Sequence, residues 1–276
     1  MRSPSYETVL VPLDGSELAD AAVPWAILIA RKTGAWLNLV TVLPHGADPK
    51  VDHPDHATQR SLAQARENAG VLTPRTATSI LAGDSATEID RESRAMAADL
   101  IVMASHGRSG IARTLLGSVT SRVLRLSNVP VLVVKPSTSP YPEIEMVVAP
   151  LDGSEIGAAG LAHAVELSRE CDSRLVLLHV SEDTADGNLA RDLEVTAKDA
   201  ERQGIEVDLV LVRGEAKDQI VAYADRSANA VIVLASIGAT GIGPSRRGSV
   251  ADHVVCHSSS PTMVVPPVEY VGPVIE

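Results

Sequence analysis

The chain has 276 residues, of which 45% are hydrophobic and 21% charged, so it can hold two globular domains with a core each. Phenylalanine is absent, aromatic residues make up 2%, and the net charge is −11, which together argue against base stacking and general binding to a nucleic-acid backbone. We therefore expect no nucleic-acid partner. Because no apolar run resembles a signal peptide or reaches transmembrane length, we also expect a cytoplasmic protein without a membrane partner.

Hydrophobic runs alternate with segments of helical spacing along the first half of the chain. Pro24 is expected to kink the first helix, and Gly34 to end it. The expected strands are 8–13, 36–42, 76–81, 99–103 and 130–134. The expected helices are 18–33, 57–72, 85–97 and 119–127.

The same order returns after a proline-rich linker at 135–142. The expected strands of the second half are 145–150, 174–180, 206–212, 230–234 and 261–265. Its expected helices are 155–171, 189–203, 216–227 and 249–257. Strands that alternate with helices predict α/β domains with parallel sheets and right-handed crossovers. The domain boundaries are placed at 1–136 and 143–276.

Two landmarks show that the halves are a domain duplication. The first strand of each half ends in P-L-D-G-S-E, and the two aspartates, Asp14 and Asp152, are 152 − 14 = 138 residues apart. Each half also has a glycine, nine further residues and then Gly-Ser, starting at Gly107 and Gly238, with an offset of 238 − 107 = 131. A period this long indicates repeated domains and not a solenoid.

The glycine-bearing loop lies between an expected strand and an expected helix, an arrangement that suits a phosphate. Gly107 permits close approach of a ligand to the backbone, and Gly117-Ser118 places amide groups at a helix N-terminus, where the dipole favours an anion. A plain connection is the alternative. Two copies with identical spacing favour a ligand loop, or one that was formerly functional.

Asp14 ends a parallel strand, where ligands of open α/β sheets bind, although Asp-Gly-Ser is also a common turn sequence. His106 could contact a phosphate, but Ile237 replaces it in the second half, so the shared architecture does not require it. The sequence has no G-x-x-x-x-G-K-[ST] loop and no G-x-S-x-G elbow. We therefore expect a binding site without an evident catalyst.

Two further groups of residues have a structural interpretation that we favour. Prolines interrupt a metal-like series in one polar loop, so we expect no metal there; the series is His45, Asp48, Asp52, His53, Asp55 and His56. Cys171 and Cys256 lie in helical patterns without metal or redox spacing, which predicts buried free thiols.

The chain resembles the universal stress protein family in its tandem form. The resemblance covers nearly the whole sequence and is carried by V-P-L-D-G-S, A-P-L-D-G-S, H-G-R-S-G, G-S-V-T-S-R-V-L-R and N-V-P-V-L-V-V. It implies a Rossmann-like, open five-stranded parallel sheet in the order 3-2-1-4-5, with helices on both faces of each domain. Many members bind ATP through G-x-x-G, nine residues and G-[ST], and others lack the motif and do not bind it.

The resemblance implies an adenine-nucleotide site in each half, with ATP, alone or with Mg²⁺, as the ligand. In the first half the matched residues are Pro12, Asp14, Val42, Met103, Gly107, Gly117, Ser118, Val119 and Thr120. In the second half they are Pro150, Asp152, Val180, Leu234, Gly238, Gly248, Ser249 and Val250. Ala104 and Ala235 stand where the family has its first glycine, so a methyl group either crowds the ribose or narrows the pocket.

The second loop departs further from the family pattern, with Pro244 and a pair of arginines, Arg246 and Arg247, that either bind phosphates or face solvent. The expected function is a nucleotide-binding role in stress response. The alternative is a stress-responsive interaction protein with empty pockets, and a nucleotide-dependent enzyme is the least favoured. Family members commonly dimerise through their last strands. We therefore expect 130–134 and 261–265 to pair as an internal pseudo-dimer, which leaves room for a further homodimer.

Overall fold

The computed structural model describes residues 6–49, 52–72, 75–106, 116–136, 142–153, 157–181, 187–236 and 248–267. The first half contains β1 (Thr8–Pro12), α1 (Glu17–Asp20), α2 (Ala22–Thr33), β2 (Trp36–Leu43), α3 (His56–Leu72), β3 (Thr76–Ala82), α4 (Ser85–Ala95), β4 (Leu100–Ala104), α5 (Ser118–Leu126) and β5 (Val131–Val134). The second half contains β6 (Met146–Pro150), α6 (Gly157–Cys171), β7 (Arg174–Ser181), α7 (Gly187–Glu201), β8 (Val207–Arg213), α8 (Ala216–Ala224), β9 (Ala230–Ala235), α9 (Ser249–His257) and β10 (Thr262–Val265).

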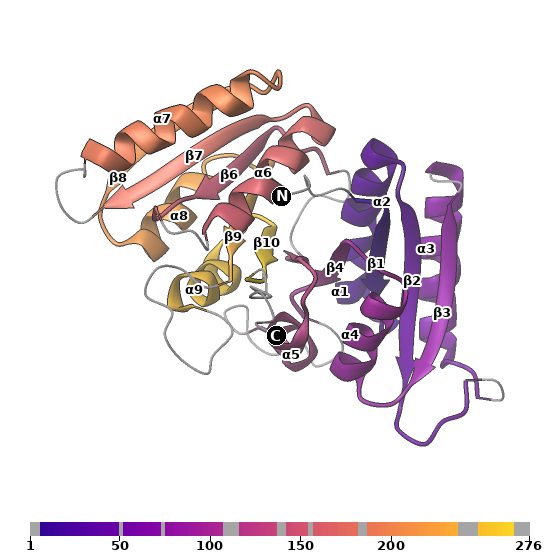
Figure 1. Cartoon of the computed structure of the whole chain (residues 1–276). Helices are drawn as coiled ribbons and strands as arrows, with labels where there is room; N and C mark the ends of the chain where they lie inside the picture. Colours follow the sequence, from indigo (N-terminus) through magenta and orange to yellow (C-terminus); the bar gives the residue numbers. More distant parts are fainter. Residues whose placement is uncertain are drawn as a thin grey trace, which may run out of the picture.

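The ten strands in the described part of the chain form one sheet in the order β3-β2-β1-β4-β5-β10-β9-β6-β7-β8 (Figure 1). Each half therefore has the predicted 3-2-1-4-5 order, and all pairs within a half are parallel. The order reverses between β1 and β4, because the chain winds first to one side of β1 and then to the other. Such a reversal opens a crevice at the carboxyl ends of the strands.

The two halves meet at β5 and β10, which is the predicted pairing of the last strands. This pair is antiparallel, with Val133 opposite Thr262 and Leu132 opposite Met263. The pairing closes the apolar edge that each half would otherwise expose. The internal pseudo-dimer is thus confirmed, whereas association of two chains stays a prediction.

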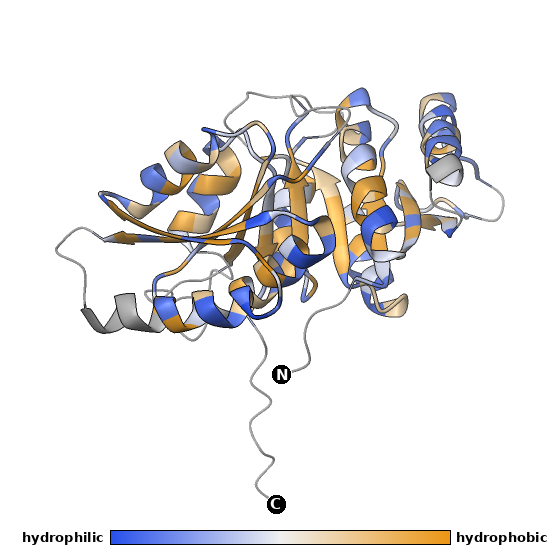
Figure 2. Ribbon diagram, turned by 90° about the horizontal axis from the view of Figure 1, so that it is seen from above, coloured by the Kyte–Doolittle hydropathy of each residue, from blue (hydrophilic) through white to orange (hydrophobic). Residues whose placement is uncertain are grey.

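Side chains alternate between the two faces of the sheet and build different cores. One face carries a single core that runs through both halves under α2, α3, α6 and α7. The other face carries two separate cores, one under α4 and α5 and one under α8 and α9. Figure 2 shows the resulting hydropathy, with apolar strands and helices that have an apolar and a polar side. Among the described helices, none has the length and apolarity required to cross a bilayer.

The predicted first helix is wrong in one respect. It consists of two helices, α1 and α2, that are separated at Ala21, instead of one helix kinked at Pro24. Proline has no N–H for the carbonyl four residues earlier, which belongs to Asp20, and its ring clashes with that carbonyl. The interruption therefore falls before the proline. Where both ends of the other segments are described, their ends differ from the prediction by at most three residues.

Gly34 ends α2 in a left-handed conformation with φ of 75°, and no atom lies within 4 Å of the position of an added Cβ. A Gly34→Ala variant is expected to lower the free energy of unfolding by about 1 kcal/mol, because the left-handed region is unfavourable for a residue with a side chain. The matched variant is Gly70→Ala, at an exposed position of helix α3 and also without a neighbour within 4 Å. It should stabilise by roughly 0.5 kcal/mol through helix propensity. Equal effects of the two substitutions in urea unfolding would contradict this assignment.

Candidate functional site

A pocket of about 250 Å³ lies at the crevice where the strand order of the first half reverses. Ten of the predicted site residues line it, namely Pro12, Asp14, Val42, Met103, Ala104, His106, Gly117, Ser118, Val119 and Thr120. Gly107 lies outside the described residues. Sequence analysis missed five further lining residues: Leu13, Ala19, Val40, Ser85 and Ile89. Val40 and Ile89 are apolar residues in an expected strand and an expected helix, which predicts burial but does not indicate a pocket.

The turn after β1 forms one wall. The backbone N–H and the hydroxyl of Ser16 both donate to Oδ1 of Asp14, at 3.0 and 2.6 Å. Ser16 Oγ in turn accepts from Ala19 N at 3.1 Å and caps α1. Asp14 therefore organises the turn, in agreement with the interpretation of Asp-Gly-Ser as a turn sequence. Asp14 also lines the pocket.

The end of β2 forms the next wall, because β2 continues beyond the end of β1. Leu13 N donates to Val40 O at 2.8 Å, and the hydroxyl of Thr41 donates to Leu13 O at 2.8 Å. Peptide groups two residues apart face the same edge of a strand, so those of Val42 face the side on which β1 has ended. Among the described strands, that edge of Val42 has no partner strand.

The start of α5 forms the opposite wall. Gly117 N donates to Ser105 O at 2.8 Å, which brings the helix start against the end of β4. Gly117 provides no side-chain cap, and a Cβ at this position would lie 3.1 Å from Ser105 O. The Thr120 hydroxyl donates to Ala104 O at 2.9 Å, so this side chain holds the helix to the strand. What the helix offers a ligand is therefore its first backbone amides.

An ion pair joins α4 to α5 beside this pocket. Arg122 donates to both carboxylate oxygens of Asp84, at 2.6 and 2.7 Å, and Asp84 also caps α4 by accepting from Thr87 N at 3.1 Å. The guanidinium of Arg122, with the Thr87 hydroxyl, holds the pKa of Asp84 well below its usual range. The pair ties together the helices that carry Ser85 and Val119, which both line the pocket.

The second half places its matched residues at the equivalent edge of its own strands. Pro150 ends β6, Leu234 and Ala235 end β9, and Gly248 precedes Ser249 and Val250 at the start of α9. Asp152 follows β6, Val180 lies near the end of β7, and Gly238 is outside the described residues.

Two features of this second crevice differ from the first. At the 131-residue offset, Ala251 replaces Thr120, so the hydroxyl that ties helix to strand is lost. Helix α6 approaches β9 so closely that a Cβ at Gly160 would lie 2.9 Å from Ala235 N, whereas at the 138-residue offset the first half has Ala22, which carries a Cβ. The two crevices are therefore not equivalent.

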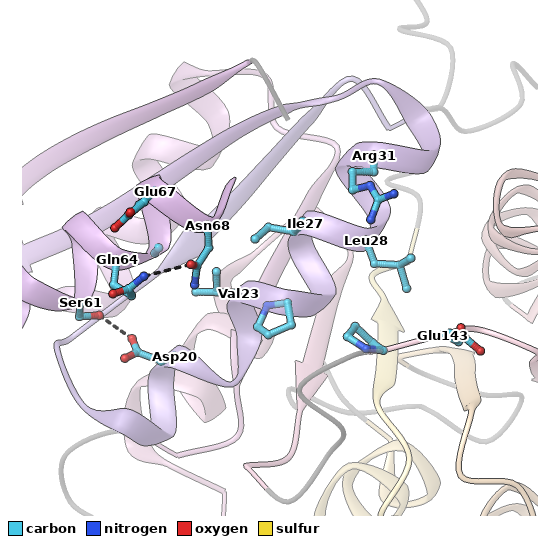
Figure 3. A pocket seen from close by; sticks show the side chains of 13 residues that line it. Asp20, Val23, Ile27, Leu28, Arg31, Ser61, Gln64, Glu67, Asn68 and Glu143 are labelled. Carbon is cyan, nitrogen blue, oxygen red and sulfur yellow. Dashed lines mark hydrogen bonds between the residues drawn. The ribbon is translucent and has the colours of Figure 1, made fainter. Parts of the chain in front are cut away.

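A larger cavity of about 710 Å³ lies elsewhere, between α2 and α3 and beside Pro142 and Glu143 (Figure 3). Ser61 donates to Asp20 at 2.5 Å within it, and burial raises the pKa of Asp20. None of the predicted site residues lines this cavity. Volume alone does not identify a site, whereas the smaller pocket combines a helix N-terminus, a strand-order reversal and the repeated motifs.

The residues that suggested other chemistry have local roles. Asp52 accepts from Asp48 N at 2.7 Å, and Asp55 accepts from Thr58 N at 2.8 Å at the start of α3. No group of three or more metal-ligating side chains gathers within the described parts of the chain. Both cysteines are free; Cys171 is buried as predicted, whereas Cys256 is only half-buried.

Comparisons with known proteins bear on this architecture. The model of the universal stress protein family matches residues 5–135 and again 143–266. A universal stress protein of Mycolicibacterium smegmatis is 26% identical over 94% of this chain and 97% of its own length. One of Methanocaldococcus jannaschii is 32% identical over 47% of this chain and 82% of its own length.

A solved structure shows the same arrangement of two halves. The crystal structure of a universal stress protein from Archaeoglobus fulgidus has a TM-score of 0.75 and 26% identity, and the match covers 96% of this chain and 99% of that one. The family model accounts for both halves, and relatives of full length share their order. The chain therefore belongs to the universal stress protein family, in its tandem form.

Proposed function

We propose that this protein binds an adenine nucleotide, ATP with or without Mg²⁺, in the first-half pocket and acts in a stress response. The observation that carries the proposal is convergence: ten residues from the ends of β1, β2 and β4 and the start of α5 line one pocket. They were selected from sequence motifs that lie as far as 108 residues apart, from Pro12 to Thr120 (120 − 12 = 108).

The two ends of the pocket suit the two ends of a nucleotide. Val40, Ile89 and Met103 supply an apolar wall for a base. The peptide edge of Val42 offers a donor and an acceptor, which complement the Watson–Crick edge of adenine. Gly117, the N-cap residue of α5, has no side chain to cap the helix, and the first amides of α5 suit a phosphate.

Ala104 decides between this proposal and its alternative. Ala104 is buried and lines the pocket, so it adds a methyl group where a glycine would have none. If the methyl only narrows the pocket, binding survives with reduced affinity; if it blocks the ribose, the half is an interaction module. The same substitution at Ala235 makes an interaction protein with empty pockets the second candidate.

We further propose that the protein is a binder and not an enzyme. Ser16 Oγ caps α1 by accepting from Ala19 N, and Asp14 Oδ1 accepts from the N–H of Ser16 as well as from its hydroxyl, so both side chains are engaged in the turn. Any ATP hydrolysis would then be slow and incidental. Turnover of ATP with Mg²⁺ at rates typical of enzymes would contradict this.

The purified protein is expected to release adenine nucleotide on denaturation, and to bind ATP in a calorimetric titration. An Ala104→Gly variant should bind ATP several-fold more tightly, because it removes the methyl group from the pocket. Absence of nucleotide and of ATP binding in both proteins would overturn the proposal and favour the interaction protein. Binding by the variant alone would show that the methyl closes the natural pocket.

A further inference from the structure

We infer that two copies of this protein associate through β8, which pairs antiparallel with β8 of the second copy so that the two sheets continue into each other. β8 is the last strand at one end of the sheet, and β3 is the last strand at the other end (Figure 1). None of the residues that line the candidate pocket belongs to β8. This inference is therefore independent of the proposed function.

The first observation is an open row of backbone groups along β8. Within the described part of the chain, β8 pairs only with β7. Leu175 N donates to Glu206 O at 2.8 Å at one end of this pair, and Gly214 N donates to Ser181 O at 3.1 Å at the other. The even-numbered residues of β8 therefore turn their peptide groups toward β7. The odd-numbered residues turn theirs toward the open edge, namely Val207, Leu209, Leu211 and Arg213. Such a row is a template for a further strand.

The second observation is that β8 is apolar where the other end strand is polar. The two strands are equivalent by the duplication, because Gly83 follows β3 and Gly214 follows β8 at the 131-residue offset (214 − 83 = 131). β3 reads T-A-T-S-I-L-A, and β8 reads V-D-L-V-L-V-R. Where β3 has two threonines and a serine, β8 has valine, leucine and valine. Edge strands that stay unpaired are commonly protected by charges or proline, and the centre of β8 has neither.

The third observation is an exposed apolar side chain on the same strand. Leu211 has an exposed fraction of 50%, whereas Ile80, its equivalent on β3, is only half-buried at most positions of its surface and is not among the exposed large hydrophobic residues. A strand added beside β8 would cover Leu211, and burial of such a side chain is favourable. The hydrophobic contribution therefore acts at the β8 end of the sheet.

The fourth observation points to a second copy as the partner. At the junction within the chain, Leu132 on β5 lies opposite Met263 on β10, and these are equivalent positions of the two halves (263 − 132 = 131). Equivalent strands of this repeated domain thus already pair antiparallel about a local two-fold axis. Two identical β8 strands can repeat that arrangement, because a two-fold interface needs only the same surface on both sides.

The sequence of β8 suits such an axis. When the two strands overlap over their full length, the axis passes beside Val210, and Leu209 of each copy lies opposite Leu211 of the other. Asp208 and Arg213 then lie opposite valines, so no like charges face each other directly. β8 carries one acidic and one basic residue, so a chain with a net charge of −11 meets its copy along a neutral strand.

Sedimentation or light scattering over a concentration series tests the association. The natural protein should reach a mass of 2 × 29.0 = 58.0 kDa. Leu209→Pro removes an N–H that faces the open edge and no bond to β7, so it should fold and raise the dissociation constant at least about tenfold. Leu211→Lys places a charge on the edge and should do the same. The matched variants Thr78→Pro and Ile80→Lys make these changes on β3 and should leave the association unchanged.

The other outcomes would overturn the inference. A natural protein that stays monomeric at every concentration would do so, and would leave this edge to a strand of a different protein. A dimer that survives both β8 substitutions would place the contact on another surface. Equal weakening by the β3 variants would show an effect of the substitutions that is not specific to β8. Urea unfolding verifies the fold of each variant, and Leu211→Lys decides the question if Leu209→Pro does not fold.

Discussion

A Gly117→Asp variant is expected to remain folded and to lose at least about a hundredfold in affinity for ATP, which corresponds to roughly 3 kcal/mol. Gly117 is the residue before α5, and its N–H already bonds to Ser105 O at 2.8 Å. An aspartate at this position would accept hydrogen bonds from the first amides of the helix, which are the groups proposed to hold the phosphates. Its negative charge would also repel them.

The same substitution should cost little stability. Aspartate is a better N-cap than glycine by a few tenths of a kcal/mol, which offsets the close contact of 3.1 Å between its Cβ and Ser105 O. Fluorescence or calorimetric titration with ATP measures the affinity, and urea unfolding verifies the fold. A folded variant that binds ATP as tightly as the natural protein would contradict the proposed position of the phosphates.

Two controls separate charge from bulk and the first half from the second. Gly117→Ala adds the same Cβ without the carboxylate and should lose no more than about tenfold in affinity. Gly248→Asp makes the matched change before α9, which also begins without a side-chain cap. It should leave first-half affinity unchanged.

The second large effect concerns acid stability at the junction of the two halves. Between pH 7.5 and pH 5, the free energy of unfolding of the natural protein is expected to fall by about 2 kcal/mol more than that of a His163→Gln variant. His163 lies on α6 of the second half, with Nδ1 3.2 Å from the hydroxyl of Tyr6 in the first half. The Tyr6 hydroxyl also lies 3.7 Å from the sulfur of Met263 on β10.

Burial lowers the pKa of His163 from 6.5 to about 4, and the carboxylate of Asp99 opposes this with a smaller effect. Below about pH 6.5 the unfolded chain takes up a proton that the folded protein takes up only near pH 4. Stability is therefore full above about pH 7 and declines as the pH falls toward 4, by about 3 kcal/mol in total at about 1.4 kcal/mol per pH unit.

Glutamine can still form a hydrogen bond with Tyr6 but does not titrate. The carboxylates titrate in both proteins, so their contribution cancels when the two pH dependences of the free energy of unfolding are subtracted. Urea unfolding of both proteins across this pH range measures the difference. The same pH dependence in the natural protein and in His163→Gln would show that His163 takes up its proton equally well in both states.

Much of the fold could be predicted because it is encoded locally. Apolar runs such as those of β4 and β9 are buried on both faces of a parallel sheet, and each one is bounded by turn or capping residues. Gly34 ended α2 as predicted because its left-handed conformation is a property of one residue. One helix kinked at Pro24 was predicted, whereas α1 and α2 separate at Ala21, since the clash of a proline acts on the preceding turn.

The candidate site was predicted in part for a related reason. Asp14 and Gly117 are marked by motifs that also fix local backbone shape, so their sequence signal is strong. Ser85 and Val40 carry no motif, and they line the pocket because α4 and β2 are brought to it by the order of the strands. Similarly, nothing in the sequence pairs Asp84 with Arg122, which lie 122 − 84 = 38 residues apart on different helices.

The sequence by itself determined the repeat, the alternation of strands and helices, and the residues at the carboxyl ends of β1 and β4. These features depend on hydrophobic periodicity and on the special backbone of glycine and proline, which act within a few residues. Only the tertiary structure decided that His106 has a buried nitrogen without a partner, that α6 lies directly on Ala235, and that Tyr6 meets His163 across the junction. Burial and pairing of this kind arise where distant segments pack, because desolvation depends on every neighbour at once.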